Sequence, residues 1–143
     1  MPAQPAGYSG TPLPRKLSIK PGHRIALIGA PEGFATVLGE LPAGLARVGA
    51  EDGSAVDLAL FFTRSAEALR EAFGRLGRRV YPAGTLWISW PKKASRVPTD
   101  LTEDVVRAIG LQAGMVDVKV CAVDETWSGL KFVYRLADRP GRG

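Results

Sequence analysis

The chain has 143 residues, of which 45% are hydrophobic and 23% charged, a composition typical of one soluble globular domain. Its formal net charge of +5 comes from basic residues scattered along the chain, which indicates a mildly basic surface rather than a nucleic-acid-binding block. The single cysteine and single histidine exclude an internal disulfide and any metal site that needs several such ligands.

The N-terminal 14 residues are rich in Pro, Gly and Ser and predict a flexible arm that Tyr8 and Leu13 could anchor to the body. They lack the charged-then-apolar pattern of a signal sequence, and no apolar run reaches the roughly 18–20 residues of a membrane span. We therefore expect a cytoplasmic protein without a membrane partner. A single α/β domain is expected over residues 15–137, followed by a frayed tail over 138–143.

Short apolar segments between turn residues predict a buried parallel sheet. The first segment is 24–29, and a glycine-punctuated turn leads from it into a short helix over 34–38. A brief strand at 44–48 and a polar loop at 51–54 come next. The run VDLALFFT at 56–63 is almost continuously apolar, which is typical of a strand covered on both faces.

The next segment predicts an amphipathic helix. Ser65 is a good N-cap, because its hydroxyl can accept a hydrogen bond from a free N–H of the first turn. Leu69, Phe73 and Leu76 recur at helical spacing and form one apolar stripe. Gly77 is predicted to end the helix.

The strongest strand signal is the stretch TLWISWPKKAS at 85–95. Leu86, Ile88 and Trp90 alternate with Trp87, so bulky side chains are expected on both faces of one strand. The strand runs directly into a basic loop. We expect it to be central to the sheet and to deliver that loop to one edge.

The last third of the sequence predicts a helix and a hairpin. Asp100 and Glu103 have the spacing of a capping box, with Asp in place of the usual Ser or Thr, and Gly110 is expected to end the helix. Strands at 116–123 and 130–136 then form an antiparallel hairpin around a turn at 125–129.

These elements predict a shortened Rossmann-like α/β fold, with a mostly parallel open sheet of five or six strands and a C-terminal antiparallel hairpin. Ligands of such sheets bind at the carboxyl ends of the parallel strands. Function is therefore expected where several loops meet at that edge, namely 29–34, 63–65, 90–95 and 124–129.

The order of elements from residue 56 to residue 136 resembles the C-terminal half of the class I methyltransferases, which bind S-adenosylmethionine. The strands VDLALFF and LWISWPKK and the final hairpin carry this resemblance. Over residues 8–137 the chain is also similar to a small bacterial family catalogued as a domain of unknown function, which supplies a fold and no established activity. That similarity rests on YSGTPLPRKLSIKPG at 8–22, WPKKAS at 90–95, TDLTEDVVR at 99–107 and VCAVDETWSGLKFVYRL at 120–136.

The methyltransferase resemblance implies a cofactor loop after the first strand. The positions that it assigns to cofactor binding are Gly29, Glu32 and Gly33. The loop reads Gly-Ala-Pro-Glu-Gly, a degenerate form of the superfamily's glycine-rich loop, because Pro31 removes one amide donor. The superfamily's acidic residue for the ribose hydroxyls has counterparts here only in Glu51 and Asp52, and the chain is short by at least one strand–helix unit.

Two polar loops at the same predicted edge supply the other candidate binding residues. These are Lys92, Lys93, Ser95, Asp124, Glu125, Thr126 and Trp127. The lysine pair either holds a phosphate or carboxylate as point charges or simply solubilises the loop. Trp127 either caps the core or offers a recognition platform. Asp124 and Glu125 are adjacent and point apart in extended chain, so they do not predict a catalytic acid–base pair.

The remaining reactive residue types favour structural roles. Cys121 stands among apolar residues of a strand, where it is expected to behave as a small buried hydrophobe. His23 is expected at the edge of the first strand, without a metal. Arginines 70, 75, 78 and 79 give a basic helix face, but no RNA- or DNA-binding motif accompanies them.

Because no complete catalytic constellation is visible, the main interpretation is a non-catalytic binding or interaction module on a degenerate methyltransferase-like fold. It needs no cofactor, and its partner would be a small anionic or nucleotide-like ligand or another protein. The alternative is a compact S-adenosylmethionine-dependent methyltransferase. A second alternative is nucleic-acid binding through the basic helix face.

Overall fold

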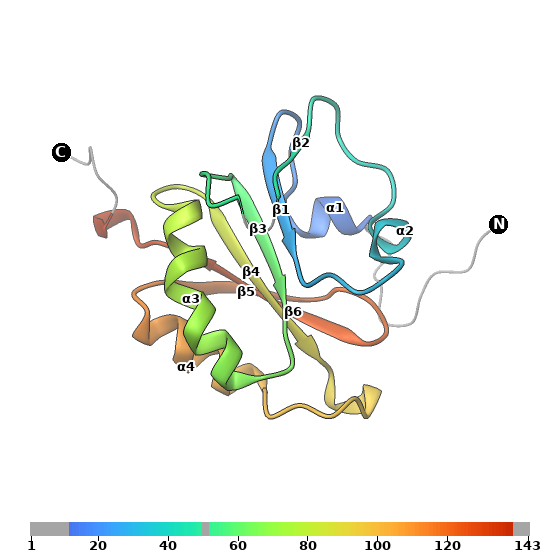
Figure 1. Cartoon of the computed structure of the whole chain (residues 1–143), viewed down its shortest axis with the longest axis vertical. Helices are drawn as coiled ribbons and strands as arrows, with labels where there is room; N and C mark the ends of the chain where they lie inside the picture. The colour runs from blue at the N-terminus through green and yellow to red at the C-terminus, as the bar shows by residue number, and fades with distance from the viewer. Residues whose placement is uncertain (1–11, 50–51, 139–143) are drawn as a thin grey trace.

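The computed structural model describes residues 12–49 and 52–138, and within them one sheet of six strands has the order β2-β1-β3-β4-β6-β5 (Figure 1). The strands are β1 (Arg24–Ile28), β2 (Ala46–Arg47), β3 (Leu58–Phe62), β4 (Thr85–Pro91), β5 (Val116–Ala122) and β6 (Trp127–Val133). The helices are α1 (Leu13–Lys16), α2 (Phe34–Leu38), α3 (Ala66–Val80) and α4 (Glu103–Gln112), with 3-10 turns at Lys93–Ser95 and Leu136–Asp138.

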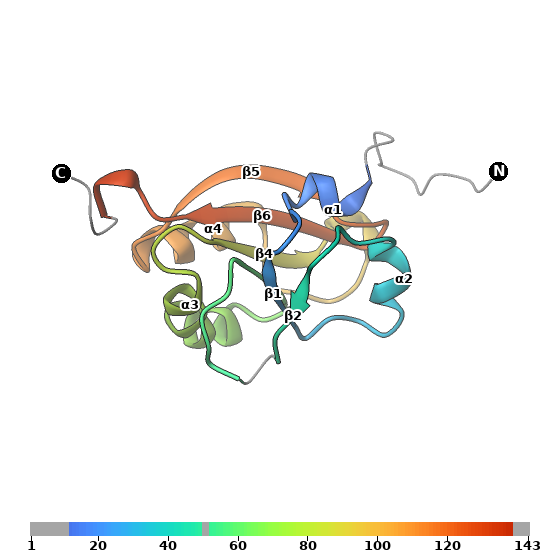
Figure 2. The same cartoon turned by 90° about the horizontal axis from the view of Figure 1, so that it is seen from above.

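Strands β1 to β4 are parallel, and β6 is antiparallel to both of its neighbours, β4 and β5. The mostly parallel sheet and its C-terminal antiparallel hairpin confirm the predicted fold class. The hairpin folds back so that its second strand, β6, lies next to β4, while β5 forms the outer edge (Figure 2).

The alternation along β4 divides the hydrophobic core into two layers. Leu86, Ile88 and Trp90 pack on the face covered by α3 and α4, whereas Trp87 packs on the face covered by α1 and α2 (Figure 1). The indole N–H of Trp87 donates to the carbonyl of Leu17 at 3.0 Å, which ties the end of α1 to the centre of the sheet. The predicted central role of this strand is confirmed.

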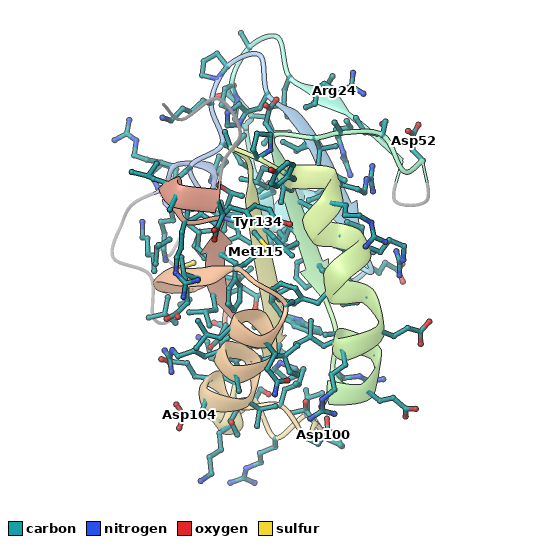
Figure 3. All side chains as sticks on the ribbon, turned by 90° about the vertical axis from the view of Figure 1, so that its left-hand side faces the viewer. Arg24, Asp52, Asp100, Asp104, Met115 and Tyr134 are labelled. Atoms are coloured by element: carbon teal, nitrogen blue, oxygen red, sulfur yellow. The ribbon has the colours of Figure 1, made fainter. Side chains whose placement is uncertain are left out.

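Two glycines that were predicted to end helices lie inside them instead. Helix α3 continues past Gly77 to Val80, and α4 continues past Gly110 to Gln112. A Cβ on Gly77 would meet the hydroxyl of Tyr134 at 3.0 Å, and Met115 lies next to it (Figure 3). These glycines serve close packing against other elements, so their effect on helix length is overridden.

The predicted capping box at Asp100 is wrong. Thr102 is the N-cap of α4, where its hydroxyl accepts from the N–H of Val105 at 3.2 Å. The Asp100 carboxylate accepts at 2.8 Å from the N–H of Ala66, the first residue of α3. Asp100 therefore stabilises the start of the other helix, where the helix dipole favours a negative charge.

The second hairpin strand begins three positions earlier than predicted. Asp124 accepts hydrogen bonds from the N–H groups of Thr126 and Trp127, both at 2.8 Å, and so closes a tight turn. Residues Trp127 to Gly129, predicted to be loop, instead pair with the end of β4. The turn is correspondingly short.

Helix α1 crosses the predicted boundary between arm and domain at residue 14. Leu13 is buried, as the proposed anchoring requires, while Tyr8 and the rest of the predicted arm lie outside the described residues. The predicted tail is described only at Asp138. Within the described part of the chain, no helix has both the length and the apolarity to span a membrane.

Candidate functional site

The structure brings the loops after β1, β3 and β4 and the hairpin turn together at the carboxyl edge of the sheet. Phe62, the last residue of β3, joins them, because its ring contacts Phe34 at a centroid distance of 4.8 Å and Trp127 at 5.2 Å. The N–H of Lys92 donates to the carbonyl of Thr126 at 2.7 Å, which connects the basic loop with the hairpin turn. We call this region the carboxyl edge.

The turn after β1 has two glycines with left-handed backbone. Gly29 has φ +71°, and a Cβ there would meet the carbonyl oxygen of Phe62 at 2.8 Å, so glycine is needed for packing against β3. Gly33 has φ +83° and no heavy atom within 4 Å of its would-be Cβ. Glu32, at the tip of the turn, is exposed. The turn is therefore tight at its base and open at its tip.

Asp52 does not reach this edge. Strand β2 pairs only with Arg24 and Ile25 at the start of β1, so the chain leaves the sheet before the carboxyl ends of its neighbours. The Asp52 carboxylate accepts from the N–H of Ser54 at 3.0 Å. Figure 3 shows Arg24 and Asp52 at one end of the molecule and Asp100 and Asp104 at the other.

At that end of the molecule, the surroundings of Asp52 favour the charged form of its carboxyl group. Hydrogen bonds from the side chain and backbone of Ser54 lower the pKa of Asp52, and the charges of Arg79 and Arg24 lower it further. Asp52 is thus a poor counterpart for the ribose-binding acid of a methyltransferase. Its other counterpart, Glu51, lies outside the described residues.

The residues at the carboxyl edge fit S-adenosylmethionine in part. The open tip at Gly33 leaves room for a ligand to approach the backbone of the turn. The carboxylates of Asp100 and Asp124 already accept backbone N–H groups. Glu32 is exposed on the turn itself.

The basic loop owes its shape to its own hydroxyl groups. The Ser95 hydroxyl donates to the carbonyl of Lys92 at 2.6 Å and accepts from the N–H of Val97. The Thr99 hydroxyl donates to the carbonyl of Arg64, also at 2.6 Å. Because these hydroxyls have structural partners, the ammonium groups of Lys92 and Lys93 are what this loop offers an anion.

The residues of the hairpin turn also divide into those with structural contacts and those that are exposed. Asp124 and Thr126 take part in the hydrogen bonds that shape the turn, and Trp127 is half-buried edge-on to Phe62. Glu125 is exposed. Of the two interpretations of Trp127, the geometry favours the core cap.

Cys121 lies partly buried beside the core layer that α1 and α2 cover. Burial raises the pKa of its thiol, and this effect outweighs the charges of Lys16, Lys119 and Lys92, which lower it. A thiol with a raised pKa is a weak nucleophile at neutral pH. His23 lies just before β1, and its Nδ1 accepts from the N–H of Lys20 at 3.2 Å.

The basic helix face is smaller than predicted. Arg79 is only 4% exposed, and its guanidinium donates to the carbonyls of Ser54 at 2.9 Å and Gly49 at 3.1 Å. It binds the loop before β3 to the end of α3. The exposed arginines of this helix are Arg70, Arg75 and Arg78.

Sequence reasoning missed a cavity of about 480 Å³ at the amino edge of the sheet, opposite the loops described above. Its lining includes Ser18, Lys20, His23 and Lys131. One signal was present in the sequence. Lys131 stands between Leu130 and Phe132, which are both buried on the other face of β6, and a charged residue on the face opposite them stood out as the position to examine.

Comparison with known proteins supports the fold. No family model matches the chain, so its similarity to the bacterial family of unknown function stays a prediction. No curated protein matches it either.

Solved structures do match. A SAM-dependent methyltransferase from Aquifex aeolicus is similar with a TM-score of 0.60 and 18% identity, over 82% of this chain and 85% of that one. Magnesium protoporphyrin IX methyltransferase from Synechocystis PCC 6803, with bound SAH, gives 0.59 and 13%, over 80% and 75% of the two chains. A TehB-like SAM-dependent methyltransferase from Corynebacterium glutamicum gives 0.55 and 10%, over 91% of each chain. The chain therefore has a methyltransferase-like fold.

Proposed function

We propose that this chain is a compact methyltransferase that binds S-adenosylmethionine at the carboxyl edge. The observation that carries the proposal is the strand order, in which an antiparallel β6 lies between β4 and β5 while β1 ends in a glycine turn with an open tip. The similar solved structures include several described as SAM-dependent methyltransferases, which supports this choice over a module without catalysis.

In this proposal the turn at 29–33 holds the cofactor. The N–H groups of Ala30, Glu32 and Gly33 are donors for it, whereas Pro31 has none. The Glu32 carboxylate accepts from the ribose hydroxyls, in place of an acid after β2. When bound, S-adenosylmethionine supplies an electrophilic methyl group on a sulfonium.

The methyl acceptor is expected to be anionic. Lys92 and Lys93 follow β4 at the same edge, and their ammonium groups attract a negatively charged acceptor as point charges. A carboxylate or phenolate needs no general base to accept a methyl group. Such an acceptor suits this edge, because the carboxylates of Asp100 and Asp124 accept backbone N–H groups and so have structural roles instead of acting as general bases.

A second candidate is the non-catalytic binding module. The specific observation that favours it is the position of Asp52 at the opposite end of the molecule, beside Arg24 and Ser54. With Asp52 away from the carboxyl edge, that edge could retain a ligand and lack the alignment needed for transfer.

Isothermal titration with S-adenosylmethionine and S-adenosylhomocysteine tests the proposal, using two matched glycine variants. Gly33 and Gly53 have φ of +83° and +80°, and neither has a heavy atom within 4 Å of its would-be Cβ. Gly33→Val and Gly53→Val therefore impose similar backbone strain at opposite ends of the molecule. We expect micromolar binding that Gly33→Val weakens at least tenfold and Gly53→Val leaves unchanged.

Absence of binding to the wild-type chain would reject both the proposal and its cofactor. Where binding is found, transfer of a labelled methyl group to a panel of small carboxylates and phenols separates the two candidates. Methylation supports the methyltransferase. Binding without methylation of any acceptor supports the non-catalytic module.

A further inference from the structure

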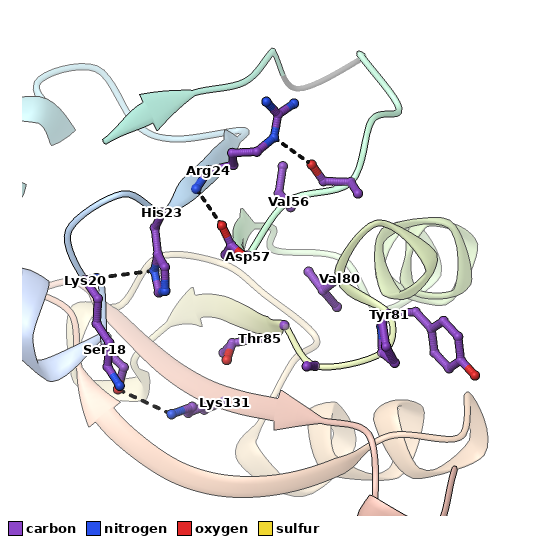
Figure 4. A pocket seen from close by; sticks show the side chains of 14 residues that line it. Ser18, Lys20, His23, Arg24, Val56, Asp57, Val80, Tyr81, Thr85 and Lys131 are labelled. Atoms are coloured by element: carbon purple, nitrogen blue, oxygen red, sulfur yellow. Dashed lines mark hydrogen bonds between the residues drawn. The ribbon is translucent and has the colours of Figure 1, made fainter. Parts of the chain in front are cut away.

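The cavity at the amino edge, which we call the amino-edge pocket, is walled by parts of the chain that are far apart in sequence (Figure 4). The segment after α1 contributes Ser18 and Lys20, and the start of β1 contributes His23. The opposite walls come from residues 80–85, between α3 and β4, and from Lys131 of β6. Its volume of about 480 Å³ lies in the range of sites for small organic ligands.

Lys131 is the most informative residue of this pocket. It pairs with Trp87 in the sheet register and is half-buried on the face where α1 packs. Its ammonium donates to the Ser18 hydroxyl at 3.3 Å, and no carboxylate forms an ion pair with it among residues 12–49 and 52–138. A partly desolvated cation without a counter-ion is unfavourable unless something anionic completes it.

Other positive charges lie close by. Burial lowers the pKa of Lys131, and the charges of Lys119 and Lys20 lower it further. Lys119 faces Lys131 across the β5–β6 pairing, and its ammonium donates to the carbonyl of Lys16. Mutual repulsion of these lysines makes the region an attractive place for an anion.

His23 adds a hydrogen-bond donor. Because its Nδ1 accepts from the N–H of Lys20, the proton of the neutral ring resides on Nε2, which is then a hydrogen-bond donor. The pocket's carboxylate, Asp57, accepts from the N–H of Arg24 at 2.8 Å, on the β1 side. Figure 4 shows Asp57 beside Arg24 and apart from the Ser18–Lys131 pair, so the anion-attracting part of the pocket is the Lys20–Lys131 side.

Part of the remaining lining is apolar, and Arg24, Asp57 and Thr85 add polar groups to it. Pro82 is half-buried and Ala83 exposed, and together they form an apolar wall in front of Val56 and Val80, which are almost fully buried. Such a wall accommodates the organic body of a ligand whose charged group lies at the lysines. The pocket is thus suited to a molecule with one anionic end and one apolar end.

We propose that the amino-edge pocket binds a small phosphate-bearing molecule, whose phosphate lies between Lys131, Lys20 and His23 and whose body packs against Pro82 and Ala83. Two ammonium groups and an imidazole match the charge and the several acceptor oxygens of a phosphate better than those of a single carboxylate. The site is separate from the carboxyl edge, and neither depends on the other.

Isothermal titration of the full chain with phenyl phosphate, inorganic phosphate and benzoate tests the proposal at fixed ionic strength. The variants are Lys131→Met and Lys20→Met in the pocket and Arg75→Met on the exposed face of α3, which changes the net charge equally. We expect phenyl phosphate to bind at least tenfold more tightly than benzoate. Each pocket variant should weaken its binding at least tenfold, and Arg75→Met should change it less than twofold.

Several results would overturn the proposal. One is no heat with phenyl phosphate at millimolar concentration, and another is an equal loss in Arg75→Met, which indicates non-specific charge attraction. Preference for benzoate would reject the phosphate assignment. Lys20 is exposed, so Lys20→Met tests binding even where Lys131→Met perturbs folding. Binding of S-adenosylmethionine to the same variants should not change.

Discussion

Replacing Gly110 by Ala should destabilise the protein, although alanine is the better helix former. Gly110 is buried in α4, against the fully buried ring of Phe132 in β6. An added Cβ would meet Cζ of that ring at 2.5 Å and Cδ1 at 2.7 Å, so the ring or the helix must move. Gly74, in α3, is exposed, and the nearest atom to its would-be Cβ is Nη1 of Arg78 at 3.8 Å.

The two substitutions share the same gain in helix propensity, about 1 kcal/mol. Overpacking at Gly110 costs about 1–3 kcal/mol, and the rigid ring and the depth of overlap place it at the upper end. We therefore expect Gly110→Ala to lower the free energy of unfolding by about 2 kcal/mol and Gly74→Ala to raise it by up to about 1 kcal/mol. Urea unfolding followed by circular dichroism measures both, and a stabilised Gly110→Ala would refute the packing of α4 on β6.

Three further predictions concern buried or half-buried polar groups. Arg79→Met should lower the free energy of unfolding by about 1–3 kcal/mol, because the carbonyls of Gly49 and Ser54 lose a donor. The same substitution should leave retention of the protein on heparin unchanged, and loss of retention would restore the basic-face hypothesis. Cys121 should react slowly with a thiol reagent at pH 7.5 and rapidly in urea, since burial raises its pKa, and fast reaction of the folded chain would contradict this. The folded pKa of Lys131 lies below the unfolded value near 10.5, so the unfolded chain binds more protons, and the free energy of unfolding of the wild type should rise as the pH increases toward 10.5. Urea midpoints measured against pH should lack this rise in Lys131→Met. Parallel pH profiles for the two proteins would disprove the prediction.

Local sequence pattern was sufficient for the elements whose structure depends on burial. The apolar runs that became β1 and β3, and the alternation of Trp87 with its neighbours along β4, predicted the sheet and its two cores. Each of these signals lies within one strand. Their common orientation then brought the loops at their carboxyl ends together, as the parallel topology requires.

Features that depend on distant partners were not predictable in this way. Asp100 has the spacing to cap its own helix, but its carboxylate binds Ala66, 34 positions away. Gly77 and Gly110 carry the local signal of a helix end, whereas their surroundings, Tyr134 and Phe132, are supplied by the hairpin. In each case a tertiary contact overrides a local preference.

The position of Asp52 shows the same limit at the candidate site. A strand at 44–48 was predicted, and an acid after it would then lie near the glycine turn. The strand has only two residues, Ala46 and Arg47, and both pair with the start of β1. Where a short strand ends decides which edge its loop reaches, and composition carries no information about that.

The most direct test of the central claim, that the carboxyl edge binds an adenosyl cofactor, is a map of backbone amide shifts in the ¹⁵N-labelled chain during titration with S-adenosylmethionine. The account predicts saturable shifts at Ala30, Gly33 and Thr63, with Lys20 and Thr85 at the amino edge unchanged. Shifts confined to the amino edge, or none at millimolar cofactor, would contradict it.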